Sequence, residues 1–421
     1  MASSDQGPAA ADHSAQAAAH WLRSAAAVRQ RAAAMLALAE ADGLAHFVVR
    51  TEALDRCADY VIDTIRERYP DLAVPFHSRW RHFTAGGVDR WAVLTAGLAE
   101  APLERARIGV DLVVTSVLLD AGAGPDWRYR EPATGACYTR SEGLAVASVQ
   151  MFRDGLFSAD PGVPLRADAA ALEWLTAEDL GRAMQVGPDN PLAGLTGRAE
   201  LLARLAAAMR ADSQRFGQAP RIGHLVDHVL ALADTNGALP AAELLGVLLD
   251  ALGGIWPERP RLAGVELGDV WQHSALVADD ATSGWVPFHK LSQWLAYSLV
   301  EPLADAGVTI TELDGLTGLP EYRNGGLFID LGVLAVRDPA RLLEPQPVDD
   351  EFVVEWRALT VALLDRLAER IRERLGADAA DWPLIRVLEG GSWHAGRRIA
   401  RERRGPTGPP PVTIVSDGTV F

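Results

Sequence analysis

The helical character of this chain is clearest in residues 52–70, EALDRCADYVIDTIRERYP. Apolar side chains recur there every three or four residues, as on one face of a helix, and Pro70 ends the pattern. The apolar positions are Leu54, Ala58, Val61, Ile62 and Ile65. The same period predicts further helices at 20–38, 89–100, 103–121, 141–153, 177–187, 192–212, 221–233, 240–252, 288–304, 351–375 and 391–403. Strand patterns are short, at 308–311, 327–329 and 412–415. The sequence therefore predicts a mainly α protein, a single large helical domain with a few short strands.

Three segments are expected along the chain. Residues 1–18 read as a flexible N-terminal tail, and residues 19–404 as the helical catalytic domain. Residues 405–421 end on an alternating apolar pattern, so we expect this extended C-terminal segment to dock on the body. The connection 122–140 is long and rich in Gly, Pro and aromatic residues, and loops of this length are more often functional than accidental.

The charge and hydropathy of the chain exclude several function classes. Its 421 residues include 40 Lys+Arg and 56 Asp+Glu, which gives a formal net charge of -16. Nucleic-acid binding needs clustered positive charge, so no nucleic-acid partner is expected. No run of uninterrupted apolar residues is long enough to span a membrane, and the N-terminus lacks the pattern of a secretory signal. We therefore expect no membrane association and a cytoplasmic location.

Metal, disulfide and cofactor chemistry are not expected. The two cysteines, Cys57 and Cys137, are too few for a disulfide framework or a cysteine-based zinc site. His224 and His228 have a metal-binding spacing but lack the neighbouring Glu of the known motif and an obvious third ligand. No dinucleotide-binding or nucleophile-elbow motif is present.

Lys290 is the single lysine of the chain, beside 39 arginines. It follows Pro287 in the first turns of a predicted helix and shares one face with Gln293, Trp294 and Tyr297. One interpretation is an ordinary amphipathic helix whose lysine extends to solvent. Lysine, however, offers a compact charge with a tunable pKa that arginine lacks. We therefore interpret this face as a candidate site.

Two other segments carry charged residues in unusual settings. Glu321-Tyr322-Arg323 precedes Asn324-Gly325-Gly326, a pattern typical of a turn that allows close approach of the backbone. The alternative is a structural Glu–Arg pair. Residues 351–360 include Glu351, Glu355 and Arg357, and here the alternative is a solvated acidic edge.

Two predicted helix starts are suited to anions. They lie at Arg140-Ser141 and at Gly390-Gly391, where free backbone N–H groups and a nearby arginine favour a phosphate. Ser141 and Ser392 also fit the simpler role of helix N-caps.

These segments together resemble two protein families. Remote similarity to the queuosine-nucleotide N-glycosylases rests on Phe288-x-Lys290-x-x-Gln293, Pro320-Glu321-Tyr322-Arg323 and Val354-Glu355-Trp356-Arg357-Ala358-x-Thr360. A closer match, over nearly the whole chain, is to a family of formerly unknown function in the URC pathway of uracil catabolism. Its blocks appear here as Arg79-Trp80-Arg81-His82-Phe83, residues 116–124, Arg140-Ser141-Glu142-Gly143-Leu144, residues 321–326 and Leu388-Glu389-Gly390-Gly391.

The resemblance implies a fold similar to the DNA glycosylases, acting on a small phosphorylated nucleoside-like substrate without a cofactor. Carried over to this chain, the catalytic residues are Glu321 and Lys290. Glu321 departs from the glycosylase pattern, which has Asp, so a different substrate or pose is implied. The substrate-binding residues expected are Gln293, Trp294, Tyr297, Tyr322, Arg323, Arg357, Asp120, Arg140, Ser141, Gly390 and Gly391.

The activity that fits the uracil pathway is an N-glycosidase. It would cleave the C1–N bond of a ribosylurea 5′-phosphate to urea and ribose 5-phosphate, through an oxocarbenium-like state that a carboxylate stabilises. Two alternatives stay open: a non-catalytic nucleotide-binding partner of the other uracil catabolic enzymes, and a hydrolase of ring-opened ureido intermediates. Association with those enzymes is expected in the first alternative.

Overall fold

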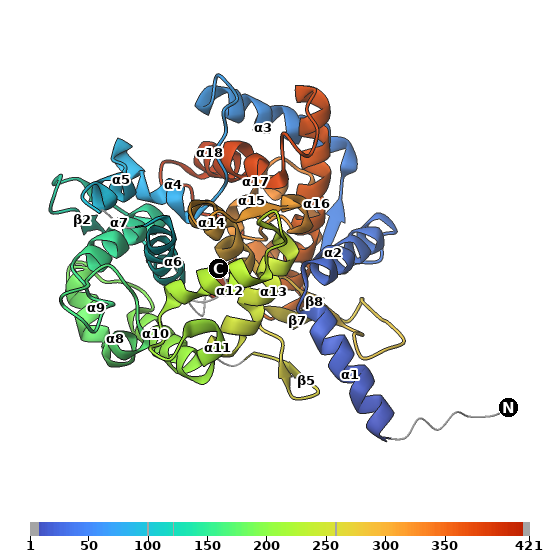
Figure 1. Cartoon of the computed structure of the whole chain (residues 1–421). Helices are drawn as coiled ribbons and strands as arrows, with labels where there is room; N and C mark the ends of the chain where they lie inside the picture. The colour runs from blue at the N-terminus through green and yellow to red at the C-terminus, as the bar shows by residue number, and fades with distance from the viewer. Residues whose placement is uncertain (1–7, 99–100, 121, 257–258, 416–421) are drawn as a thin grey trace. The chain divides into compact units, whose positions relative to one another are not determined.

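A computed structural model describes residues 8–98, 101–120, 122–256 and 259–415. Contacts divide these residues into two compact units. Unit 1 comprises residues 8–77, 259–293 and 313–415, and unit 2 comprises residues 78–256 and 294–312. Helix α14 (Lys290–Asp305) begins in unit 1, and its residues from 294 onward belong to unit 2. The prediction of a mainly α protein with only short strands is confirmed (Figure 1).

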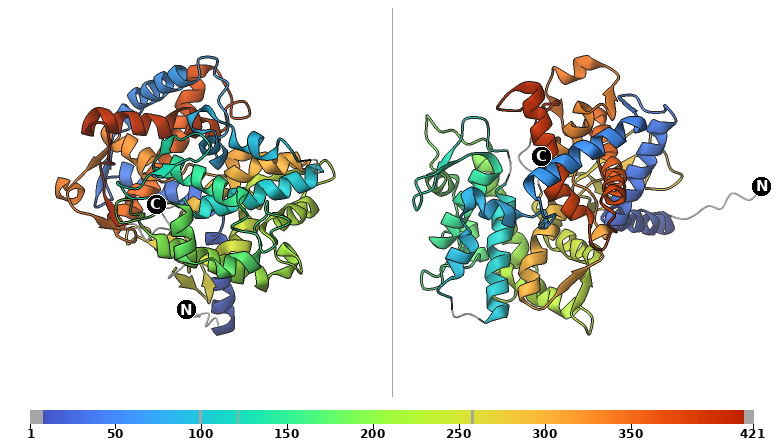
Figure 2. Two further views of the ribbon diagram at one scale, coloured as in Figure 1. Left: turned by 90° about the vertical axis from the view of Figure 1, so that its left-hand side faces the viewer. Right: turned by 90° about the horizontal axis from the view of Figure 1, so that it is seen from above.

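Unit 1 is built around one long helix. Helix α16 (Glu351–Leu375) is buried on all sides over residues 352–364, and helices α2 and α3 pack against it (Figure 1). Figure 2 shows these blue N-terminal helices beside the red C-terminal ones. Each Leu, Val or Phe buried in this way contributes about 1.5–3 kcal/mol. The helices of unit 1 are α1 (Pro8–Leu22), α2 (Ala25–Glu40), α3 (Leu54–Arg68), α15 (Tyr322–Asp330), α16, α17 (Leu384–Val387) and α18 (Trp393–Arg404), with a π-helical segment at Leu388–Ser392.

Unit 2 has a comparable central helix. Helix α6 (Pro102–Leu118) is buried on every face from Ile108 onward, and α4, α7, α10 and α12 pack against it. From Ile108 onward no face of α6 reaches solvent, and the sequence of this part is accordingly almost continuous in apolar and small residues. The other helices of the unit are α4 (Arg79–Phe83), α5 (Arg90–Thr95), α7 (Arg140–Arg153), α8 (Ala169–Trp174), α9 (Ala177–Ala183), α10 (Leu195–Ala211), α11 (Ser213–Phe216), α12 (Leu225–Leu232) and α13 (Ala241–Leu252).

The strands form two-stranded pairs of two or three residues each. In unit 1, β1 (Phe47–Val49) pairs with β10 (Leu334–Val336), β5 (Arg261–Leu262) with β6 (Val265–Glu266), β7 (Val270–Gln272) with β8 (Trp285–Pro287), and β11 (Gln346–Pro347) with β12 (Ile414–Val415). In unit 2, β2 (Tyr129–Arg130) pairs with β3 (Cys137–Tyr138), and β4 (Ala238–Pro240) with β9 (Thr309–Thr311). The parallel β11–β12 pair and buried Val412 attach the C-terminal segment, up to Val415, to unit 1.

Two local predictions need correction. The strand expected at 327–329 is wrong, because these residues belong to α15, whose start is capped by Glu321. The helix expected over 20–38 is broken at Ser24, whose side chain accepts the N–H of Ala27 at 3.1 Å and starts α2. Helix α1 begins at Pro8, within the segment expected to be a flexible tail, and residues 1–7 lie outside the described part of the chain.

Candidate functional site

The Glu321 carboxylate is fixed by the helix that it caps. Its two oxygens accept the backbone N–H groups of Arg323 at 2.7 Å and of Asn324 at 2.5 Å. Its backbone is extended, with φ -111° and ψ 166°, as an N-cap requires. Glu321 is only 9% exposed, so this carboxylate is nearly dry and cannot rotate without losing two charge-assisted hydrogen bonds.

Opposing influences act on the pKa of Glu321. Burial raises the pKa above its ordinary value, and the Arg323 and Asn324 N–H groups, followed by the Lys290 charge, lower it again. The net direction is upward. The structure therefore brings the two residues expected to be catalytic within electrostatic reach inside unit 1. A carboxyl group with a raised pKa is better suited to exchange protons near neutral pH.

Lys290 begins α14 on a rigid backbone. Its N–H donates to Asp269 Oδ2 at 3.1 Å, and the preceding residue, His289, adopts a positive φ of 47°. The His289 ring is anchored at 2.8 Å to the carbonyl of Leu22. The left-handed residue His289 turns the backbone into the start of α14. The contacts of Lys290 with Asp269 and of His289 with Leu22 then fix the backbone position of Lys290.

Arg357 supports this turn through Asp269. It donates two hydrogen bonds to the Asp269 carboxylate, at 2.8 and 2.7 Å, and its guanidinium lies 4.0 Å from the ring centre of Phe288. Burial alone would raise the pKa of Asp269, but Arg357 outweighs burial and holds the pKa well below its usual range. Arg357 was expected to bind substrate. Its contacts here are those of a residue that positions the Lys290 turn.

Gln293 was also expected to bind substrate, and it joins two segments of unit 1. Its amide nitrogen donates to the carbonyl of Phe288 at 2.9 Å and to Thr317 Oγ1 at 2.8 Å. Its amide oxygen accepts the N–H of Thr317 at 2.8 Å. Because Thr317 lies just before the Glu321 turn, Gln293 holds the start of α14 against that turn.

Arg323 and Tyr322 begin α15. The Arg323 guanidinium lies 5.0 Å from the Tyr322 ring centre and donates to the carbonyl of Gly408 at 2.7 Å. This contact ties α15 to the C-terminal segment. The glycine after Asn324 has a packing reason, because a Cβ on Gly325 would lie 2.6 Å from the Trp356 indole.

The helix start expected at Gly390-Gly391 is wrong. Residues 384–404 run without interruption as α-helix, π-helical segment and α-helix, so no free N-terminus exists there. A Cβ on Gly391 would lie 2.3 Å from Val61 Cγ1 of α3, so close helix packing accounts for this glycine. Ser392 is buried and donates to Asn324 Oδ1 at 2.9 Å, which links the segment to the Glu321 cap.

The same π-helical segment carries a cluster that the sequence did not reveal. Glu389 contacts His77 Nδ1 at 2.9 Å, accepts the Tyr69 hydroxyl at 3.1 Å and lies 3.6 Å from His394. Burial raises the pKa of Glu389, but hydrogen bonds from His394 and His77 outweigh this effect and hold the pKa far below its usual range. The sequence signal that could have found Glu389 was its place in the Leu388–Gly391 block. The structure adds that this block is π-helical, and π-helical segments often occur at functional sites.

The remaining predicted residues lie in unit 2. Ser141, in the first turn of α7, accepts Arg79 Nη1 at 3.2 Å through its carbonyl, and Arg140 has a positive φ of 55°. Asp120 contacts Arg79 Nη1 at 3.0 Å. The Arg79 guanidinium also lies 5.7 Å from the Trp294 ring centre, and Tyr297 is fully buried. Sequence reasoning did not select Arg79, although it opens one of the blocks that carry the resemblance.

The described residues hold neither a metal-binding cluster nor a membrane-spanning helix. No group of three or more His, Cys, Asp or Glu side chains there has metal-binding geometry. His224 instead contacts the carbonyl of Phe216 through Nδ1 at 2.6 Å. No helix in the described ranges is long and apolar enough to cross a membrane.

Comparison with known proteins places the chain in a family. A family model described as "Protein of unknown function (DUF1688)" matches residues 21–421. The chain belongs to this family. Protein urg3 of Schizosaccharomyces pombe is 40% identical over 401 residues, covering 94% of this chain and 96% of that protein. Uracil catabolism protein 4 of Lachancea kluyveri is 37% identical over 409 residues, covering 89% and 92% respectively.

These comparisons confirm the resemblance to a uracil-catabolism family of unknown function. Within the structure, the sequence blocks on which the resemblance rested contribute buried polar residues to both units. Glu321 and Glu389 belong to unit 1, and Arg79, Asp120 and Ser141 belong to unit 2. The remote similarity to nucleotide N-glycosylases, and with it the catalytic roles, stays a prediction.

Proposed function

We propose that this chain acts in uracil catabolism as an N-glycosidase that hydrolyses a ribosylurea 5′-phosphate. Water adds to C1 of the ribose, the C1–N bond breaks, and the nitrogen leaves with a proton as urea, giving ribose 5-phosphate. The pathway comes from the relative named Uracil catabolism protein 4. The reaction comes from the resemblance to nucleotide N-glycosylases in the segments around Lys290 and Glu321.

One observation carries the proposal: the buried carboxylate of Glu321, which accepts two backbone N–H groups, lies within electrostatic reach of the single lysine. Cleavage of the glycosidic bond builds positive charge at C1, and a fixed anion in a dry environment stabilises it without having to reorganise. The raised pKa also allows Glu321 to accept the proton of the attacking water. In this mechanism Lys290 keeps Glu321 ionised and donates a hydrogen bond to the departing urea.

The support is specific to this pair. Gln293 and Arg357, which the sequence also proposed for substrate binding, are engaged in holding the two segments that carry Lys290 and Glu321. Preorganised supports of this kind are what a site needs when its charges must stay within a fraction of an ångström. Phosphate binding at Arg140 and Ser141 stays a prediction.

The test is direct incubation of the purified chain with ribosylurea 5′-phosphate, followed by assays for urea and for ribose 5-phosphate. Both products should appear in equal amounts. Glu321→Gln should lower kcat by about a hundredfold or more, as expected for loss of a catalytic carboxylate. Glu344→Gln, a change at an exposed position of the same unit, is the matched control and should leave kcat unchanged.

The outcomes separate the alternatives. Binding of the substrate without either product would overturn the glycosidase and favour a non-catalytic nucleotide-binding protein. Release of ammonia or carbon dioxide with the glycosidic bond intact would favour a hydrolase of ureido intermediates.

A further inference from the structure

Arg79 and Asp120 form an incomplete ion pair in the interior of unit 2. Arg79 Nη1 lies 3.0 Å from Asp120 Oδ2, and the two side chains are 0% and 5% exposed. Arg79 Nη2 and Asp120 Oδ1 are also buried, and neither has a hydrogen-bond partner among the described residues. A buried donor or acceptor without a partner costs free energy, so folded proteins rarely keep one of each side by side.

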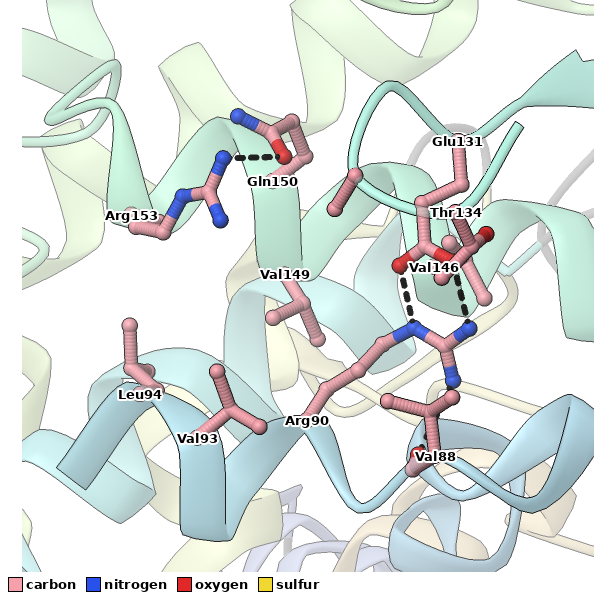
Figure 3. A pocket seen from close by; sticks show the side chains of 11 residues that line it. Val88, Arg90, Val93, Leu94, Glu131, Thr134, Val146, Val149, Gln150 and Arg153 are labelled. Carbon is pink, nitrogen blue, oxygen red and sulfur yellow. Dashed lines mark hydrogen bonds and ion pairs between the residues drawn. The ribbon is translucent and has the colours of Figure 1, made fainter. Parts of the chain in front are cut away.

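A second buried ion pair of unit 2, Arg90–Glu131, is complete by comparison. Figure 3 shows Arg90 and Glu131, also in unit 2, joined by two parallel hydrogen bonds of 2.7 and 2.8 Å. Arg90 Nη1 donates further to backbone carbonyls, including that of Phe83 at 3.0 Å. The pocket in Figure 3 is lined by this complete pair and by apolar side chains such as Val88 and Val149. Arg79–Asp120 is different, because its second donor and acceptor are left over.

From this difference we propose that Arg79 and Asp120 form a binding site for a neutral ligand with a carbonyl oxygen beside an N–H. Amides, ureas and the ring edges of pyrimidine bases have this arrangement. Arg79 Nη2 donates to the carbonyl oxygen, and Asp120 Oδ1 accepts the N–H. Asp120 was among the residues expected to bind substrate and Arg79 was not; the inference rests on this pair alone and does not depend on the proposed glycosidase.

Separate anchors hold the two side chains in this offset arrangement. Arg79 Nε donates to Ser116 Oγ at 2.8 Å, and its backbone N–H donates to Ser298 Oγ at 3.0 Å. The residue before Asp120 is held by Arg198, whose Nε donates to the carbonyl of Leu119 at 3.0 Å. Each partner is therefore fixed independently of the other, and the unpaired donor and acceptor stay in place.

The charges select the ligand class. A phosphate would face the Asp120 carboxylate, and a cation would face the Arg79 guanidinium, so neither ionic ligand is favoured. An amide holds its carbonyl oxygen and an N–H in one plane, as the planar guanidinium and carboxylate require. The Trp294 ring beside the Arg79 guanidinium adds an apolar surface.

The test is isothermal titration calorimetry on the full chain with N-methylurea, uracil, tetramethylurea and ribose 5-phosphate. N-methylurea and uracil should bind, and tetramethylurea, which lacks the N–H, should bind about tenfold or more weakly. In Asp120→Asn the amide oxygen turns toward Arg79, so an NH₂ donor replaces the free acceptor. Affinity for N-methylurea should therefore fall by about tenfold or more.

Glu131→Gln is the matched control, because it changes a buried carboxylate whose arginine pair is complete. Its affinity for N-methylurea should stay within about twofold of the unmodified chain, because the Arg90–Glu131 pair shares no hydrogen-bond partner with Arg79 or Asp120. The proposal is overturned if folded Asp120→Asn binds N-methylurea as tightly as the unmodified chain. It is also overturned if Asp120→Asn loses ribose 5-phosphate and keeps N-methylurea, since the pair would then bind hydroxyl groups.

Two features keep the test decisive. If Asp120→Asn does not fold, the comparison of N-methylurea with tetramethylurea on the unmodified chain decides, and equal affinities reject the site. Because binding is measured and not turnover, failure of the glycosidase proposal leaves this result unaffected.

Discussion

Gln293 and Thr317 bond to each other in both directions. The Gln293 amide oxygen accepts the Thr317 N–H at 2.8 Å, and its amide nitrogen donates to Thr317 Oγ1 at 2.8 Å. The pair joins the first turn of α14, which carries Lys290, to the segment that leads into Glu321. Both residues are fully buried, so the pair is sheltered from competition by water.

Replacement of Gln293 by Met should destabilise the protein by about 2–4 kcal/mol, because the Thr317 N–H, the Thr317 hydroxyl oxygen and the Phe288 carbonyl would each lose the buried hydrogen bond that Gln293 supplies. Guanidinium unfolding measures this change. Gln272→Met, at an exposed position of the same unit, should change the unfolding free energy by less than about 0.5 kcal/mol. Equal effects of the two substitutions would show that the Gln293–Thr317 pair contributes no special stability.

Replacement of Glu321 by Asp separates capping from chemistry. Aspartate is a good N-cap, so the unfolding free energy should change by less than about 1 kcal/mol. The shorter side chain withdraws the carboxylate from its place, and kcat on ribosylurea 5′-phosphate should fall by about tenfold or more. A stable variant with unchanged kcat would remove Glu321 from the catalytic role.

Removal of the Lys290 charge should shift the pH dependence of turnover. Lys290 lowers the pKa of Glu321, so Lys290→Met should raise that pKa further. If ionised Glu321 is the active form, the acidic limb of the kcat/KM profile should move to higher pH. Lys290→Arg keeps the charge and should leave the limb in place, while its different shape lowers kcat. An unmoved limb in Lys290→Met contradicts the coupling.

The Glu389 cluster should stabilise the protein at neutral pH and lose that effect in acid. The pKa of Glu389 lies far below its ordinary value, so its stabilisation is complete above the unfolded pKa of about 4.3 and is lost as pH falls toward the folded pKa. Burial also lowers the pKa of His394, so its ring is harder to protonate in the folded chain than in the unfolded chain. This difference lowers the unfolding free energy as the pH falls below about 6.5. The unfolding free energy of Glu389→Gln, measured from pH 8 to pH 3 with the unmodified chain alongside, should fall less steeply between about pH 5 and 3. Parallel curves would contradict this account.

Two glycine-to-alanine substitutions should have opposite signs. Gly391→Ala places a Cβ 2.3 Å from Val61 Cγ1, and overpacking of this kind costs about 1–3 kcal/mol. Gly246→Ala, within α13, meets nothing within 4 Å and should stabilise the protein by up to about 1 kcal/mol. Thermal unfolding distinguishes the two. Stabilisation by Gly391→Ala would show that α3 and the π-helical segment are not closely packed.

The sequence by itself determined the mainly helical fold, the family and the selection of Lys290 and Glu321. Helical periodicity depends on residues three or four positions apart, so it is visible without tertiary contacts. The uniqueness of Lys290 is a property of composition. The strand expected at 327–329 failed because a short apolar run fits a buried helix as well as a strand, and only the Glu321 cap distinguished them.

Only the tertiary structure decided what the polar side chains contact. Gln293 and Thr317 are 24 positions apart, Glu389 and His77 are 312 apart, and Arg357 and Asp269 are 88 apart. No local pattern in the chain specifies such pairings, because they arise when buried polar groups find partners as the helices pack. For this reason Gln293 and Arg357 hydrogen-bond to Thr317 and Asp269 inside the protein. The close packing of Val61 against Gly391 is likewise visible only in the folded chain. Folding also left one donor of Arg79 and one acceptor of Asp120 without a partner among the residues described.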